Sequence, residues 1–203
     1  MQKSSTRLIA LAALLGATLA GAAESRTFIF RSVEDASTPA DPAVCASAPF
    51  AANVLLGGSL WWQQTSPRDG HTSARLTRRI GKATACVQLT NFTFPPGLDQ
   101  NFYVAFDLPE GRFTATGSCK IISNRVPVAG LVLGGCSMSL TGWPQGYTGG
   151  AVVSLSTLNP FRLEGYNTGS TYVLQAYLAE DPGGEREQHL GHSMSYVELA
   201  ELP

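Results

Sequence analysis

Hydrophobic and polar residues alternate over short distances along most of the chain. From Thr27 onward, runs rich in Val, Leu, Thr, Phe and Tyr are separated by Gly, Pro, Asn and Asp, and helical periodicity is lacking. This pattern is typical of antiparallel strands joined by tight turns. The predicted strands are residues 27–33, 53–64, 72–89, 101–107, 112–123, 131–141, 151–158 and 170–178.

Two turns in the middle of the chain predict a strand register. One turn lies at residues 108–111 and the next is centred near Pro127 and Val128. Directly opposed residues of antiparallel strands point to the same face of a sheet. The first turn opposes Phe106 to Phe113, Val104 to Ala115 and Phe102 to Gly117. The second opposes Ile121 to Gly134, Gly117 to Met138, Ala115 to Leu140 and Phe113 to Gly142, so that large side chains meet small ones, as a packed interior requires.

The same register places Cys119 opposite Cys136 on this interior face. We therefore predict a disulfide between them, and by elimination a second between Cys45 and Cys86. An even number of cysteines without a C-x-x-C pair favours structural disulfides over zinc binding or thiol redox chemistry.

Glycines inside the predicted strands, such as Gly57 and Gly117, allow a sheet to coil sharply or backbones to approach closely. The sequence thus predicts an all-β protein with a single small antiparallel β-barrel of about eight strands. A two-layer β-sandwich is the alternative. In size and layout the expected barrel resembles lipocalin and allene-oxide-cyclase type barrels, and this resemblance extends to architecture alone.

The two ends of the chain differ from the barrel region. Lys3 and Arg7 precede an uncharged apolar run at residues 8–20 and small residues at 20–22, which predicts a signal peptide over residues 1–22. The apolar run is shorter than the roughly 20 residues of a transmembrane helix. We expect a barrel domain at 23–179 without a transmembrane helix, and a polar loop or tail at 180–203 that could add a last strand. The predicted location is periplasmic or secreted.

Charge and motifs restrict the chemistry. Without Lys3 and Arg7, 12 basic residues face 15 acidic ones, which argues against nucleic acid as a partner. His71, His189 and His192 are interpreted as solvated, so no metal and no cofactor is predicted. Ser118 and Ser137 lie outside any G-x-S-x-G motif. The acidic candidates for glycoside hydrolysis are Asp99, Asp107, Glu110 and Glu164, and nothing in the sequence brings two of them together.

Aromatic residues form the candidate binding site. Trp61 and Trp62 point to opposite faces of one strand, so one is expected inside and the other outside. Aromatic side chains at a barrel mouth could contact an apolar ligand or a sugar ring, or they could close the ends of the core. The candidate ligand-contact residues are Trp62, Trp143, Tyr147, Tyr166 and Tyr172.

These observations favour an exported, disulfide-bonded barrel that binds a small apolar ligand or an envelope protein without catalysing a reaction. A secreted enzyme, either a hydrolase or a barrel isomerase, is one alternative. A small outer-membrane barrel is another, against which stand the apolar inward face, the cysteines and the C-terminal Leu202-Pro203. The sequence predicts neither the particular ligand nor the oligomeric state.

Overall fold

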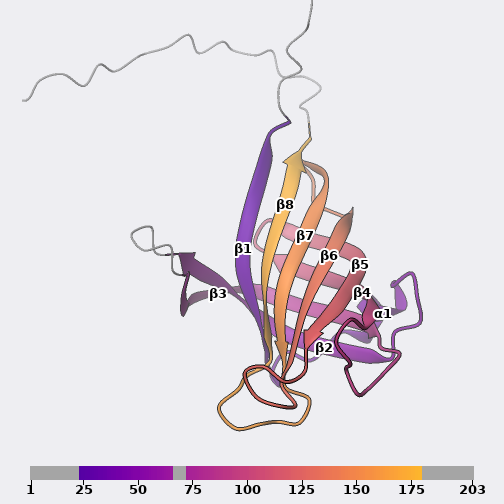
Figure 1. Cartoon of the computed structure of the whole chain (residues 1–203). Coiled ribbons are helices and arrows are strands. Elements are labelled where there is room, and N and C mark those ends of the chain that lie inside the picture. Colours follow the sequence, from indigo (N-terminus) through magenta and orange to yellow (C-terminus); the bar gives the residue numbers. More distant parts are fainter. Residues whose placement is uncertain (1–22, 66–71, 180–203) are drawn as a thin grey trace, which may run out of the picture.

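Eight strands make up most of residues 23–65 and 72–179, the part of the chain that the computed structural model describes (Figure 1). All eight predicted strands are present. Their bounds are β1 Ser25–Glu34, β2 Val54–Thr65, β3 Thr72–Gln88, β4 Asp99–Leu108, β5 Gly111–Ser123, β6 Val132–Gly142, β7 Tyr147–Leu158 and β8 Gly169–Leu178.

The strands close into a barrel in chain order. Each strand pairs antiparallel with the next, and β8 returns to pair with β1 along a register that runs from Ser25 opposite Tyr177 to Val33 opposite Gly169. Closure satisfies the backbone hydrogen bonds of both edges. The predicted barrel is therefore confirmed, and the alternative of a two-layer sandwich is wrong.

The predicted register of the central strands is confirmed except at one pair. Phe106 lies opposite Phe113, and Met138 lies opposite Gly117. Phe113 does not lie opposite Gly142, because the β5–β6 register shifts between Thr114 and Ala115, and Thr114 takes the place opposite Gly142. A bulge adds one residue to one strand, and turn positions alone do not reveal it.

Both predicted disulfides are present. Cys119 and Cys136 are directly opposed on β5 and β6, with their Cα atoms 4.0 Å apart. Cys45 and Cys86 join the β1–β2 connection to β3, with a Cα separation of 5.4 Å. Two disulfides are compatible with an oxidising compartment outside the cytoplasm.

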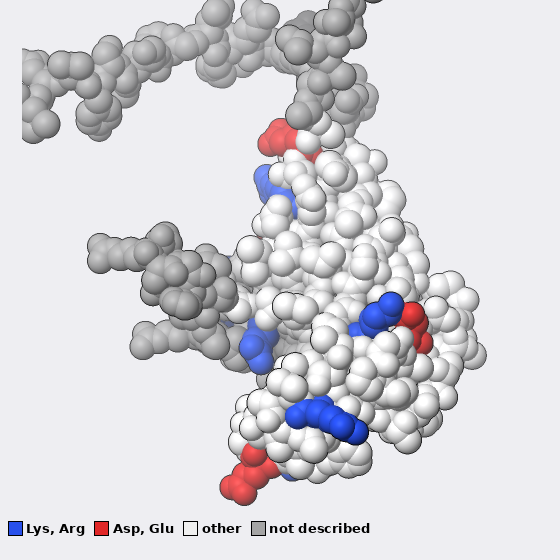
Figure 2. Space-filling model, in the orientation of Figure 1, with Lys and Arg blue, Asp and Glu red and all other residues white. Residues whose placement is uncertain are grey.

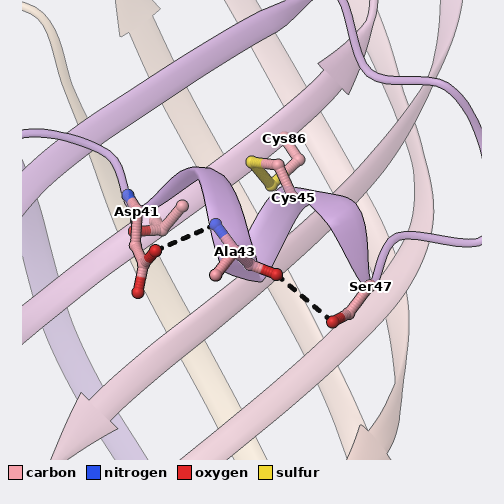
Figure 3. The surroundings of a disulfide bond; sticks show 6 residues. Asp41, Ala43, Cys45, Ser47 and Cys86 are labelled. Carbon is pink, nitrogen blue, oxygen red and sulfur yellow. Dashed lines mark hydrogen bonds between the residues drawn. A yellow bond between two sulfur atoms is a disulfide. The ribbon is translucent and has the colours of Figure 1, made fainter.

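The connection at residues 35–53, here called the strap, lies against the outside of the barrel. It contains the short helix α1 Pro42–Ala46, which the sequence pattern did not predict. Asp41 caps this helix by accepting a hydrogen bond from the backbone N–H of Ala43, and Cys45 reaches Cys86 on the strand below (Figure 3). A small apolar cluster under the strap consists of Val44, Cys45, Cys86, Tyr103 and Ala105.

A carboxylate fixes the start of the strap. The hydroxyls of Ser59 and Thr38 donate to Asp35, and Ser37 donates to it through both its hydroxyl and its backbone N–H. The hydrogen bond from Ser59, followed by those from Ser37, holds the pKa of Asp35 well below its usual value. A Cβ atom at Gly57 would lie 2.3 Å from the backbone nitrogen of Ala40, so the strap can approach β2 closely only because residue 57 is glycine.

The two ends of the barrel differ in their connections. Four long connections, at residues 35–53, 89–98, 124–131 and 159–168, define what we call the loop end. Short turns at residues 109–110 and 143–146 lie at the other end, here called the hairpin end. In Figure 1 the loop that follows β7 lies at the bottom of the barrel.

The predicted signal peptide at 1–22 and the predicted tail at 180–203 lie outside the described residues. Within residues 23–65 and 72–179, no helix is long and apolar enough to cross a membrane.

Candidate ligand cavity

A cavity of about 390 Å³ opens inside the barrel toward the loop end. Its walls include inward-facing residues from all eight strands, and the connections after β3 and β7 contribute to its rim. Small-molecule sites in proteins usually measure roughly 300 to 1,000 Å³. The cavity is thus at the lower end of the range that accommodates a small organic ligand.

Aromatic side chains fill the other half of the barrel. Near the hairpin end, the Tyr147 ring packs edge-on against Phe113, with the ring centroids 5.2 Å apart, and Phe28 contacts both rings. Deeper inside, Phe30 and Phe106 contact each other and both contact Tyr172. Because Tyr172 also lines the cavity, this second aromatic group forms its floor.

One side of the cavity is a hydrocarbon wall. Its members come from β2 to β6: Val54, Leu56, Ala83, Ala85, Val87, Phe102 and the Cys119–Cys136 disulfide. Small residues keep this wall far from the barrel axis. The alanines of β3 occupy positions where larger side chains would fill the space, so the hollow follows directly from the side-chain sizes.

The opposite side carries hydroxyl groups. Ser32 of β1, Ser156 of β7 and Ser170 of β8 line the cavity, and the Ser170 hydroxyl donates to the Ser156 oxygen at 2.8 Å. Burial raises the pKa of Tyr172 to about 12. The phenol therefore stays neutral at physiological pH. This side can exchange hydrogen bonds with a ligand without placing a charge inside the barrel.

Gln100 is a polar residue on the hydrocarbon side. It is the second residue of β4, only 8% exposed, and it lines the cavity. Among the described residues, no hydrogen bond joins its side chain to another residue, and its polar atoms are not among those that are fully buried without a partner. The carboxamide is therefore free to form hydrogen bonds with water or with a ligand in the cavity.

Charged groups line the cavity only at its rim, as far as the described residues extend. Glu34 ends β1, and Arg162 lies in the loop after β7, and both side chains are exposed. Asn159 fixes this loop: its side-chain nitrogen donates to the carbonyls of Leu163 and Tyr166, and its side-chain oxygen accepts from the N–H of Leu163.

The structure brings one of the five candidate aromatic residues into the cavity. That residue is Tyr172. Tyr147 is 8% exposed and belongs to the core at the hairpin end, whereas Trp62 packs partly buried against the same core. Trp143 and Tyr166 are exposed and do not line the cavity.

Sequence reasoning missed Gln100, Ser156 and Ser170. Strand alternation gives a signal for two of them, because Ser170 shares a face with Tyr172, and Ser156 lies opposite Ser170. The signal for Gln100 is similar, since Gln100 lies two residues before Phe102 and therefore on the same inward face of β4. The sequence pattern did not indicate which inward residues border empty space.

None of the four acidic candidates lines the cavity. Asp107 binds Arg112 through two hydrogen bonds and lies 3.9 Å from Lys82, and Asp99 lies 3.6 Å from Lys120. Among the described residues that line the cavity, Glu34 is the one carboxylate. The described ranges contain no group of three potential metal ligands, and the three histidines lie outside them.

The outside of the barrel carries few charges on one face. Figure 2 shows a broad uncharged area in the orientation in which β1, β8, β7 and β6 face the viewer in Figure 1. Leu155 of β7 is 69% exposed. Its side chain points away from the cavity.

The fold and the cavity together define a class: a closed antiparallel barrel of eight strands, packed at one end and hollow at the other. Comparison of the chain with protein-family models, with curated proteins and with solved structures finds no match.

Proposed function

We propose that this chain is an exported, disulfide-bonded barrel module that binds a small, largely apolar ligand in the cavity. The observation that supports this most strongly is the cavity of about 390 Å³, which has a hydrocarbon wall and opens at the loop end. Transfer of apolar ligand surface from water into such a wall is favourable by about 25 cal/mol per Å².

Export is part of the same proposal. Two disulfides are compatible with an oxidising compartment, and the residues at 1–22 have the charge and apolar pattern of a signal peptide. A periplasmic or secreted location agrees with both features. Mass determination of the N-terminus of the exported protein tests this location, because the proposal expects cleavage near residue 22.

A substitution that fills the cavity tests the binding function. Ala85 lines the hydrocarbon wall, so Ala85→Trp places an indole in the space that a ligand would occupy. The neutral fluorescent probe N-phenylnaphthylamine should bind the wild-type protein with enhanced emission. The A85W variant should lose at least about tenfold in probe affinity, which is about 1.4 kcal/mol.

Leu155→Trp is the matched control, because the same indole is then added to the outer face of β7. It should bind the probe as the wild type does. Ala85→Leu offers a smaller filling substitution if A85W does not fold, and circular dichroism reports folding in each case. Equal probe binding by the wild type and by folded cavity variants would contradict the proposal.

A further inference from the structure

We infer that the ligand is an uncharged, mostly hydrocarbon molecule with a hydroxyl or carbonyl group, such as a long-chain alcohol or ketone, and not a carboxylate or an ammonium ion. The inference rests on the proposed function and specifies the chemistry of its ligand. It follows from the polar groups inside the cavity and from the position of the charges.

Gln100 is the first reason. The residue is 8% exposed and lines the cavity, and its side chain makes no hydrogen bond to another described residue. A carboxamide offers two N–H donors and one carbonyl acceptor. A pure hydrocarbon would leave all of them unpaired, whereas a hydroxyl or carbonyl group can pair with at least one.

The hydroxyl strip is the second reason. Ser156 accepts the hydrogen bond of Ser170, and no described residue accepts the remaining proton of Ser156. Ser32 lines the same side of the cavity. Hydroxyl groups both donate and accept, so this strip and the carboxamide of Gln100 both suit a neutral polar group.

The distribution of charge is the third reason. Below the rim, a carboxylate or ammonium group would face a neutral phenol, serines and an amide, and no described residue there carries an opposite charge to compensate for its lost hydration. At the rim, Glu34 and Arg162 have opposite signs, so the rim selects neither an anion nor a cation. A neutral polar group avoids the cost of dehydrating a charge.

Competition among molecules of equal chain length tests the inference. Decanol, the corresponding methyl ketone, decanoate, decylammonium and decane are each titrated against bound N-phenylnaphthylamine. In the wild type, decanol and the ketone should compete at least about tenfold better than decanoate and decylammonium, because no described residue below the rim offers the ions a counter-charge.

The Gln100→Leu variant separates hydrogen bonding from hydrophobic binding. It should weaken decanol binding about twofold to twelvefold while leaving decane binding unchanged or slightly tighter, since one net hydrogen bond contributes about 0.5 to 1.5 kcal/mol. Gln175→Leu, on the outer face of β8, is the matched control and should change neither affinity. Gln100→Met replaces Q100L if the leucine variant does not fold.

The outcomes distinguish the two proposals. The inference would be overturned if decanoate or decylammonium bound more tightly than decanol. It would also be overturned if the ratio of decanol affinity to decane affinity were unchanged in the folded Gln100 variant. Either result would leave the apolar cavity function standing. If neither the probe nor any competitor binds the wild type, the proposed function itself is wrong.

Discussion

Tyr172 joins the packed half of the barrel to its hollow half. Its ring stacks on Phe30 and meets the edge of Phe106, and it also lines the cavity. The residue is 3% exposed. Burial raises the pKa of the phenol to about 12, because an ionised phenolate would lose its hydration there.

This pKa predicts a change of stability at high pH. The folded protein keeps the phenolic proton up to about pH 12, whereas the unfolded chain releases it near pH 10. The unfolded state therefore binds fewer protons between these values, and the free energy of unfolding falls as pH rises through that window. The fall from this residue is about 2 to 3 kcal/mol.

Urea unfolding of the wild type and of Tyr172→Phe across this pH range measures the effect. The variant removes the titrating group and keeps the ring. Its free energy of unfolding should fall less than that of the wild type, and the difference between the two curves should grow from about pH 10 upward. Parallel curves would show that Tyr172 titrates normally in the folded state.

The strap is attached to the outside of the barrel at two points. It is attached by the hydrogen bonds of Asp35 at its start and by the Cys45–Cys86 disulfide in its helix. That disulfide closes a sequence separation of 41 residues, whereas Cys119 and Cys136 are separated by 17. In the chain-entropy account, a longer loop gives the larger stabilisation.

Removal of each disulfide should therefore have a different cost. The Cys45→Ala/Cys86→Ala variant should lose about 4 kcal/mol in the free energy of unfolding, and the Cys119→Ala/Cys136→Ala variant about 3 kcal/mol. Chemical denaturation of both double variants and of the wild type measures this order. A larger loss for the β5–β6 disulfide would show that local packing around it outweighs the entropy of the loop.

Strands were predictable from local patterns because alternation and turn residues act over short distances. Turns at residues 108–111 and near Pro127 sufficed for the register that brings Cys119 to Cys136. Helix α1 was missed because five residues are too few for a helical period, and the bulge near Thr114 was missed because it leaves the turns unchanged.

The cavity was less predictable than the strands. Whether an inward residue borders packed core or empty space depends on how the eight strands are staggered around the barrel, which is a property of the whole sheet. Tyr147 and Tyr172 both face inward, and only Tyr172 reaches the cavity. The interpretation of the aromatic residues as closing the core is correct for Tyr147, and the ligand-contact interpretation of Tyr172 stays a prediction.

At the scale of the whole molecule, the barrel divides into a packed end and a hollow end. Phe28, Phe113 and Tyr147 fill the hairpin end, and small side chains leave space toward the loop end. Stability is therefore expected to depend mainly on the packed end, and ligand binding on the hollow end.

Two substitutions near the hairpin end test this division. Phe113 is fully buried, so Phe113→Ala should reduce the free energy of unfolding by about 3 to 5 kcal/mol. Trp143 is exposed in the neighbouring turn, and Trp143→Ala should change the free energy of unfolding by less than about 0.5 kcal/mol. Thermal or urea unfolding measures both. A small loss for F113A would mean that this end is not tightly packed.

The proposed function depends on a ligand that enters the hollow end of the barrel. Nuclear magnetic resonance titration of the labelled protein with decanol tests it most directly. Shifts are expected for the Ala83 and Ala85 methyl groups and for the Gln100 side-chain amide. The signals of Ala176 and Tyr147 should not change, because these two residues do not line the cavity. Shifts confined to the outer face or to the hairpin end, or no shifts at saturating decanol, would contradict it.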